Sequence, residues 1–228
     1  MIVAVSGTDG AGKSTQIDLL VAHLGDRGRS ARVMWHRPGY SAEAQLLKDL
    51  YRKLRPGAPP PGRSDARDAL LAHGGAGRLW RIMAYMDCAL QWGLKARWWS
   101  WTGAVVLVDR YLMDAELDLR HLFPANDVVR GLPWRLVRAL CPEPALRVVL
   151  TVASEEAIRR CAGKHDPFPV PDDVRRQREQ AYLALTSDER WTIVDATPPV
   201  EDVQRDLQAL IEPLLGSSPN PTTGEAIP

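Results

Sequence analysis

The sequence predicts an α/β fold with a five-stranded parallel sheet flanked by helices. Five short apolar segments rich in β-branched residues alternate with longer stretches in which apolar residues recur at helical spacing. This alternation is typical of a parallel sheet covered on both faces, because parallel strands need crossover connections. A length of 228 residues and a hydrophobic content of 45% suit one domain with a sizeable core. The predicted strands are 2–6, 31–36, 104–109, 147–152 and 191–195.

The first half of the chain adds two helices and a loop to this frame. Residues 14–24 follow the first strand and carry apolar residues at helical spacing. Residues 55–65, RPGAPPPGRSD, are rich in Pro and Gly and therefore predict a loop. A long helix is expected from about Gly77 to Trp101, and it is unusually rich in aromatic residues. A nucleobase could stack on one of these rings, although packing is the simpler role for any single one.

The second half contains a candidate lid. A helix is expected from Ser154, a good N-cap residue that two acidic residues follow. Arg160 and Lys164 lie four residues apart on one face, and the segment HDPFPVPDD at 165–173 ends that helix before another begins. A basic helix-loop-helix of this kind is typical of a lid that brings cations over transferring phosphates, and a merely solvated charged face is the alternative. The lid is placed at about 160–172.

The chain is expected to form one domain over residues 1–215. No linker and no internal repeat divide this range. The polar segment 216–228, GSSPNPTTGEAIP, has too little apolar content to pack and is expected to be a disordered tail.

The segment VSGTDGAGKSTQ, directly after the first strand, carries the most specific motif. It fits G-x-x-x-x-G-K-[ST], with Gly7, Gly12, Lys13 and Ser14 at the defined positions, between a predicted strand and a predicted helix. Glycines let backbone N–H groups approach phosphate oxygens at a helix N-terminus, where the helix dipole favours negative charge. Lys13 would reach the β- and γ-phosphates of ATP, and the Ser14 hydroxyl would bind Mg²⁺. The motif refines the predicted fold to the three-layer P-loop NTPase fold.

Two further sites follow predicted strands. Asp109 ends an apolar strand, a position from which a carboxylate can bind Mg²⁺ or orient an attacking oxygen. Arg110 follows it and could clamp an anionic acceptor with two parallel hydrogen bonds. Arg37 comes after the second strand, at the sheet edge where open α/β sheets bind ligands. A helix cap for Asp109 and a solvated surface role for Arg37 are the alternatives.

Composition excludes several other classes of protein. The net charge is +1, from 29 basic and 28 acidic residues, so binding to a nucleic-acid polymer is not expected. The three cysteines lack metal-site spacing and do not indicate a disulfide framework, which suits a cytoplasmic protein. No segment is apolar and long enough to cross a membrane.

Together these segments resemble the thymidylate kinase family of P-loop nucleoside monophosphate kinases, over Met1 to about Leu210. The resemblance is carried by GTDGAGKSTQ, by RPG after the second strand, by VDRY, and by the lid. It implies ATP and Mg²⁺ as cofactors, a small-molecule acceptor and a homodimer.

The resemblance also implies roles for single residues. It implies catalytic or transition-state roles for Lys13, Asp9, Asp109 and Arg110, with Ser14 and Asp109 as Mg²⁺ ligands. Because Ala11 stands where some members carry a catalytic Arg, Arg160 and Lys164 of the lid are the expected transition-state cations. The residues implied to bind the ATP phosphates are Gly7, Gly10, Ala11, Gly12, Lys13, Ser14 and Thr15.

The acceptor side departs from the family pattern. The family usually has Glu before the first loop glycine, whereas this chain has Ser6. Where the family carries a Phe that stacks on thymine and an Arg that contacts the acceptor phosphate, AYMDC gives Ala84 and Cys88. Arg81 and Tyr85 lie nearby on the same helix and could compensate. Thymidine monophosphate is therefore expected to be a poor acceptor. The expected acceptor-binding residues are Arg37, Arg81, Tyr85 and Arg110.

These observations indicate ATP-dependent phosphoryl transfer to a small anionic acceptor, with a nucleoside monophosphate ranked first. A kinase of a sugar or a biosynthetic intermediate is the alternative, favoured by the lost Phe and Arg. A GTP-binding regulator ranks far lower, because GKHD at 163–166 lacks the Asn of the guanine-reading motif and follows a helix.

Overall fold

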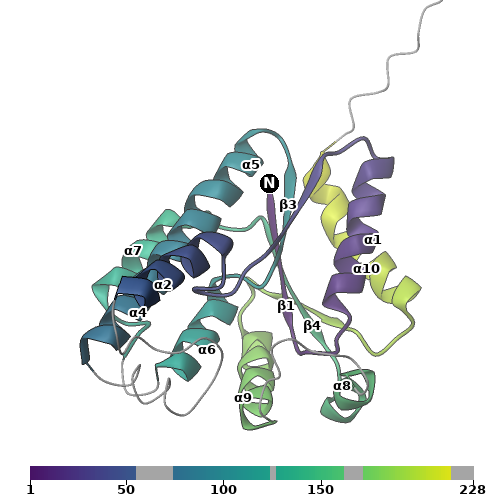
Figure 1. Cartoon of the computed structure of the whole chain (residues 1–228). Coiled ribbons are helices and arrows are strands. Elements are labelled where there is room, and N and C mark those ends of the chain that lie inside the picture. Colours follow the sequence, from purple (N-terminus) through teal and green to yellow (C-terminus); the bar gives the residue numbers. More distant parts are fainter. Residues whose placement is uncertain (55–73, 124–126, 162–171, 217–228) are drawn as a thin grey trace, which may run out of the picture.

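The computed structural model describes residues 1–54, 74–123, 127–161 and 172–216, and its centre is a parallel sheet (Figure 1). The strand order is β2-β3-β1-β4-β5, and every neighbouring pair is parallel. This confirms the predicted α/β P-loop fold, with each strand within one or two residues of its expected bounds. The strands are β1 (Ile2–Gly7), β2 (Ala31–Trp35), β3 (Val105–Asp109), β4 (Leu146–Thr151) and β5 (Thr192–Asp195).

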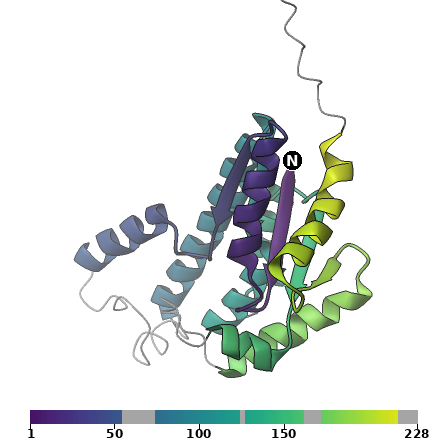
Figure 2. The ribbon, with the colours of Figure 1, turned by 90° about the vertical axis from the view of Figure 1, so that its right-hand side faces the viewer.

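Helices form a layer on each face of the sheet. α1 (Lys13–Asp26) and α10 (Val200–Leu215) pack together on one face. The other face carries α4 (Gly74–Cys88), its continuations η1 (Ala89–Ala96) and α5 (Arg97–Trp101), and α7 (Leu132–Leu140), with α2 (Ala42–Leu54) packed on α4. Figure 2, which looks onto α1 and α10, also shows α8 and α9 beneath the sheet. The remaining helices are α6 (Leu112–Leu122), α8 (Ser154–Cys161), α9 (Asp172–Leu183) and the short 3₁₀ segment η2 (Ala184–Ser187).

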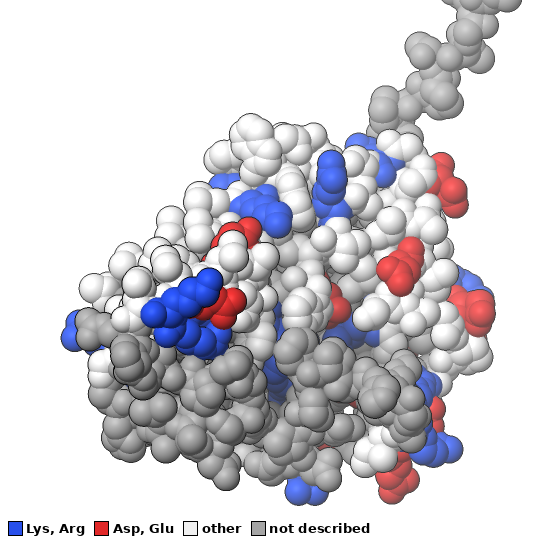
Figure 3. Space-filling model, viewed as in Figure 1, with Lys and Arg blue, Asp and Glu red and all other residues white. Residues whose placement is uncertain are grey.

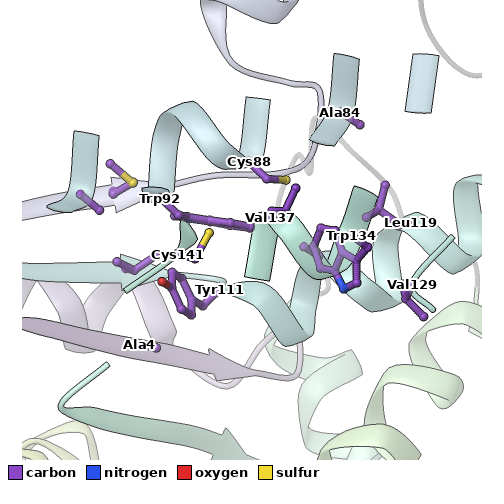
Figure 4. Packing of buried hydrophobic residues seen from close by; sticks show 14 of the residues in the cluster. Ala4, Ala84, Cys88, Trp92, Tyr111, Leu119, Val129, Trp134, Val137 and Cys141 are labelled. Carbon is purple, nitrogen blue, oxygen red and sulfur yellow. The ribbon is translucent and has the colours of Figure 1, made fainter. Parts of the chain in front are cut away.

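Each face of the sheet has its own apolar core. Ile17, Leu20 and Leu24 of α1 pack against inward-facing residues of β1, β3 and β4, and Leu207 of α10 joins the same cluster. The cluster on the other face is dominated by large rings and small residues from α4, η1, α6 and α7 (Figure 4). Burial on both faces explains why β1 and β3 are fully buried and read as continuous apolar runs.

The long helix expected over Gly77 to Trp101 begins at Gly74 and runs through a π-helical stretch in η1. Trp80 and Trp92 are buried in the core, whereas Trp98 and Trp101 are exposed. Its aromatic residues therefore divide between a packing role and an exposed surface.

Some expectations lie outside the described residues. They are the Pro/Gly loop at 55–65, most of the lid with Lys164 and GKHD, and the tail from residue 217. In the described part of the chain, no helix is long and apolar enough to cross a membrane. Basic and acidic side chains are interspersed on the face shown in Figure 3, in keeping with the net charge of +1.

Candidate active site

The phosphate loop joins the buried end of β1 to the first turn of α1. Gly10 and Gly12 adopt positive φ angles of 90° and 78°, which L side chains rarely adopt. A Cβ atom at Gly12 would meet no atom within 4 Å, so open space adjoins the N-terminus of α1. The first N–H groups of a helix lack intrahelical partners, and here they adjoin that space. The loop therefore fits the phosphates of a nucleotide, as its sequence predicts.

Lys13 is buried at the start of α1 and folds back over the loop. Its Nζ donates hydrogen bonds to the carbonyl oxygens of Gly7 at 2.9 Å and Thr8 at 2.8 Å. Burial lowers the pKa of Lys13, and the neighbouring Arg110 lowers it further. Asp9 Oδ1 lies 3.9 Å from Nζ, and a phosphate anion would supply a closer counter-charge. Ser14 and Thr15 are exposed in the first turn of α1, where their hydroxyls are accessible.

Asp109 lies at the end of β3, directly beside β1. Its Oδ1 is buried and accepts no hydrogen bond from the described residues. Burial raises the pKa of this carboxyl group, although Lys13 and Arg110 oppose the shift. An unsatisfied buried carboxylate oxygen and the exposed Ser14 hydroxyl fit Mg²⁺, which uses few protein oxygens and relies on substrate phosphates. Among the described residues, no group of three or more His, Cys, Asp or Glu side chains is arranged to hold a metal ion.

Arg110 connects the phosphate loop with β3. Its Nη2 lies 2.6 Å from Asp9 Oδ1, and its backbone N–H donates to the carbonyl oxygen of Val5. Arg110 has a φ of 73° and is the one described non-glycine residue with a positive φ. Backbone strain of this kind often accompanies functional sites, and here it turns the guanidinium toward the loop. Burial lowers the pKa of Arg110, but the carboxylates of Asp9 and Asp114 more than reverse this, so its charge is permanent.

The ion-pair network extends to two residues that the sequence analysis did not select, Asp118 and Arg178. Asp118 in α6 accepts both hydrogen bonds of a bidentate pair with Arg37, each 3.2 Å long. Arg178 in α9 also contacts Asp118 and lies 3.5 Å from Asp9. Burial would raise the pKa of Asp118, but Arg178 and Arg37 together hold it below its ordinary value. Arg37, Arg110 and Arg178 thus meet around two carboxylates.

Asp114, four residues before Asp118 on α6, organises the backbone beneath this network. It accepts hydrogen bonds from Ser6 Oγ at 2.6 Å, from the Tyr182 hydroxyl at 2.5 Å and from the backbone N–H of Tyr111 at 3.0 Å. Ser6, which stands where Glu is usual in the resembling family, therefore has a defined partner. The spacing of Asp114 and Asp118 on one helix face was the available sequence signal for this cluster.

A small cavity lies beside the network, between α2, α4 and α6. Trp80 and Phe123 are its aromatic lining residues and Ala84 is a small one, and its volume of about 10 Å³ is roughly the space of one water molecule. Lys48 is buried there, hydrogen-bonded to the carbonyl oxygen of Gly39, with its Nζ 5.2 Å from the centre of the Tyr40 ring. The lining residues are Pro38, Gly39, Tyr40, Lys48, Trp80, Ala84, Leu122 and Phe123.

Comparison with known proteins finds similar sequences along nearly the whole chain, although no family model matches it. A probable thymidylate kinase of Archaeoglobus fulgidus is 28% identical over 96% of this chain and 99% of its own length. Thymidylate kinases of Pseudomonas putida (29%, 94% of this chain, 98% of theirs) and Symbiobacterium thermophilum (27%, 94% of each) are similar to it as well. This likeness over nearly the whole chain supports a divergent member of the thymidylate kinase family.

In this thymidylate kinase-like chain, the two substituted positions of α4 have different surroundings. Ala84 lines the aromatic cavity, whereas Cys88 is fully buried in the core, where Figure 4 shows it beside Trp92 and Val137. Burial raises the pKa of the Cys88 thiol well above its ordinary value. Cys88 therefore packs and does not face the acceptor side.

The two residues expected to compensate for these positions are engaged in packing contacts. The Arg81 guanidinium lies 5.7 Å from the centre of the Phe123 ring, at the wall of the cavity. The Tyr85 hydroxyl donates to the carbonyl oxygen of Val128, and its ring packs near Trp134. Of this pair, Arg81 lies closer to the cavity lining.

Arg160, which the sequence analysis assigns to a lid, lies in α8 and is held near the end of β5. It donates to Glu156 and to the carbonyl oxygens of Ala196 and Thr197, which follow β5. α8 itself packs close to the loop, because a Cβ at Gly10 would lie 2.7 Å from the Ala157 oxygen. To reach a transferring phosphate, Arg160 would have to leave these carbonyl groups.

Proposed function

We propose that this protein transfers the γ-phosphoryl group of ATP to the phosphate of a nucleoside monophosphate, with thymidine monophosphate as the first acceptor to test. The contact that carries the proposal is the 2.6 Å pair between Arg110 and Asp9. This pair joins the phosphate loop, which suits the phosphates of ATP, to the end of β3, where Arg110 is available to the acceptor. Both halves of a phosphotransferase site thus lie at one edge of the sheet. The names of the curated relatives favour the same activity.

On the donor side, the backbone of the loop from Gly7 to Thr15 holds the ATP phosphates, and Lys13 turns from the loop carbonyls to the β- and γ-phosphates. Ser14 and Asp109 hold Mg²⁺, which neutralises phosphate charge when bound. Asp9 keeps Arg110 next to the reacting groups. Little covalent chemistry is required of these side chains, because positioning and charge stabilisation lower the barrier to phosphoryl transfer.

On the acceptor side, Arg37 and Arg110 bind the acceptor phosphate, and the cavity beside them widens to take the base. Trp80 and Phe123 offer the aromatic surface that Ala84 cannot, and Lys48 and Arg81 offer polar contacts near it. The expectation that thymidine monophosphate is a poor acceptor rests on Ala84 and Cys88 alone. These surroundings and the relatives favour a rebuilt pocket, so we replace that expectation.

The lid completes the site in this proposal. Arg160 and Lys164 supply positive charge to the transferring group once both substrates are bound. Lys164 lies outside the described residues, and Arg160 exchanges its contacts with Ala196 and Thr197 for the phosphate.

The deciding experiment is an ADP-release screen with Mg²⁺-ATP and panels of nucleoside monophosphates, nucleosides, sugars and sugar phosphates. We expect turnover with one or more nucleoside monophosphates and with no free nucleoside. Turnover confined to a sugar or a biosynthetic intermediate would overturn the proposed acceptor class. Calorimetry with ATP and GTP checks the donor, because a GTP-binding regulator would select GTP strongly.

We also propose that the protein is a homodimer that buries an apolar stripe along the long helix. Exposed apolar side chains recur there about every fourth residue, far more than a monomeric surface helix needs. The stripe consists of Ile82, Met86, Leu90, Leu94, Trp98 and Trp101.

Sedimentation velocity tests this assembly with a matched pair of variants. Leu94→Lys places a charge in the middle of the stripe and is expected to yield monomers. Leu19→Lys changes an exposed apolar residue on α1, away from the stripe, and should leave the dimer intact. A monomeric wild-type protein at micromolar concentration would refute the proposal.

A further inference from the structure

Arg178 is the most deeply buried guanidinium of the ion-pair network, and its contacts are incomplete. It lies on α9 with 5% of its surface exposed. Its Nη2 contacts Asp118, while its Nη1 has no hydrogen-bond partner among the described residues. Nη1 lies 3.5 Å from Asp9 Oδ2, which is within ion-pair range but does not make a hydrogen bond. A buried charged donor without an acceptor is unusual and points to a missing ligand.

The carboxylates around Arg178 are shared with other arginines. Asp118 also pairs with Arg37, and Asp9 also pairs with Arg110. Both carboxylates that Arg178 contacts are therefore divided between two guanidinium groups. Arg178 is the one that contacts both carboxylates, so it lies between Arg37 and Arg110 in the network.

The shared carboxylates preorganise the arginines, and among the described residues they leave Nη1 of Arg178 without a hydrogen-bond partner. Guanidinium groups bind phosphate oxygens through parallel N–H donors, and several converging on one phosphate hold it firmly. Arg37 follows β2, Arg110 follows β3 and Arg178 comes from α9, so three separate elements direct donors to one place. Arg110 is paired with the loop residue Asp9, so an anion bound there would lie next to the donor site.

We propose that Arg178 binds the phosphate group of the acceptor together with Arg37 and Arg110, and that Asp118 is the positioning residue that holds Arg37 and Arg178 for it. This inference rests on the proposed function, since it names the residue that binds the phosphate of the nucleoside monophosphate. It also gives α9 a direct role in the site, because this helix brings a cation to the acceptor.

Steady-state kinetics of Arg178→Gln test the inference, with saturating Mg²⁺-ATP and the best monophosphate from the wild-type screen. We expect the acceptor KM to rise on the order of 10- to 100-fold, the range for losing a charge-assisted hydrogen bond. The KM for ATP should stay within about twofold, an allowance for ordinary context effects. Arg178→Lys, which keeps the charge and loses the planar fork of the guanidinium, should recover part of the acceptor affinity. The matched control is Arg176→Gln, an exposed position on the same helix, which should leave both KM values unchanged.

A structural role for Arg178 predicts a different pattern. Loss of its pair with Asp118 lowers the melting temperature, so circular dichroism must first show that each variant is folded. If Arg178→Gln is unfolded, the double variant Arg178→Gln with Asp118→Asn removes both charges and takes its place. A folded variant with an unchanged acceptor KM, or with a fall in kcat alone, overturns the inference while leaving the proposed function standing. A wild-type protein that phosphorylates no monophosphate refutes the proposed function and this inference with it.

Discussion

Lys13 and Asp109 are buried charges of opposite sign, and burial works against both of them. It lowers the pKa of Lys13 and raises the pKa of Asp109, so each is shifted toward its neutral form. Among the described residues, Lys13 donates hydrogen bonds to backbone carbonyls and has Asp9 at 3.9 Å, while Asp109 Oδ1 has no hydrogen-bond partner. Such groups are costly unless a ligand compensates them, which is why they indicate a site prepared for phosphate and a cation.

Lys13→Ala should lower kcat by about 10²-fold or more, because a cation that stabilises charge in the transition state is lost. The fold should survive, since removing a buried ammonium also removes its desolvation cost. The measurement is initial-rate kinetics with circular dichroism, and Lys53→Ala at an exposed position of α2 is the control. Normal turnover by the folded variant would remove Lys13 from the catalytic machinery.

Asp109→Asn should reduce turnover far more than ATP affinity and, at the same time, stabilise the protein without ligands. The pKa of Asp109 is raised in the folded state, so its ionisation weakens the native state as pH rises through that value. At pH 7 the ionised carboxylate carries this cost, and the neutral amide of the variant avoids it. Urea unfolding should therefore show a more stable variant at pH 7 and a smaller gain at pH 4. A less stable variant at pH 7 would mean that Lys13 and Arg110 outweigh burial.

At the scale of elements, the phosphate loop depends on its contact with α8. Gly10 has a φ of 90°, and a Cβ there would lie 2.7 Å from the carbonyl oxygen of Ala157. Gly12 has a similar φ of 78°, but a Cβ there would meet nothing within 4 Å. The two glycines thus share backbone strain and differ in steric contact.

Gly10→Ala should accordingly destabilise the protein more than Gly12→Ala. Gly12→Ala carries only the cost of a left-handed backbone, about 1–2 kcal/mol. Gly10→Ala adds the collision with backbone, which cannot rotate away, and a further cost of about 1–3 kcal/mol is expected. Urea unfolding of both variants measures the difference. Equal destabilisation would show that α8 moves freely away from the loop.

Local sequence pattern was sufficient for the strands and the phosphate loop, because both are defined by neighbouring residues. Five buried strands of a parallel sheet read as apolar runs, and the loop motif carries its own glycines and Lys13. The π-helical stretch in η1 has no such signature, and helical spacing continues through it.

The acceptor side could not be assembled from local pattern. Asp118 and Arg178 are 60 residues apart in the sequence, and only the packing of α9 over α6 brings them together. Cys88 shows the opposite problem. Its position was aligned with an arginine that contacts the acceptor phosphate, but it lies in the core, so the absence of arginine there says little about the acceptor pocket. His36, which follows β2 beside Arg37, is buried against the Trp92 ring, with 4.8 Å between ring centres.

For the whole molecule, the buried network makes folding stability depend on acid pH. The pKa of Asp118 is lowered in the folded state, so its stabilising effect is complete above its unfolded value of about 3.9 and is lost as pH falls through the folded value. The pKa of Asp109 is raised, so its ionisation lowers the free energy of unfolding as pH rises from about the same unfolded value. The loss from Asp118 should dominate below about pH 4, because Asp109 is then protonated in both states.

Asp118→Asn tests this dependence. At pH 7 the variant should be less stable than the wild type by about 3–5 kcal/mol, because Arg37 and Arg178 remain buried with one counter-charge removed. As the pH is lowered from 7 to 3, the difference should shrink, since the wild-type carboxylate is progressively neutralised. Urea unfolding at several pH values measures it, with Asp206→Asn in α10, for which no comparable contact is seen in the described chain, as the reference. A difference that stays constant down to pH 3 would mean that the Asp118 charge contributes no stability and that its side chain acts only through shape.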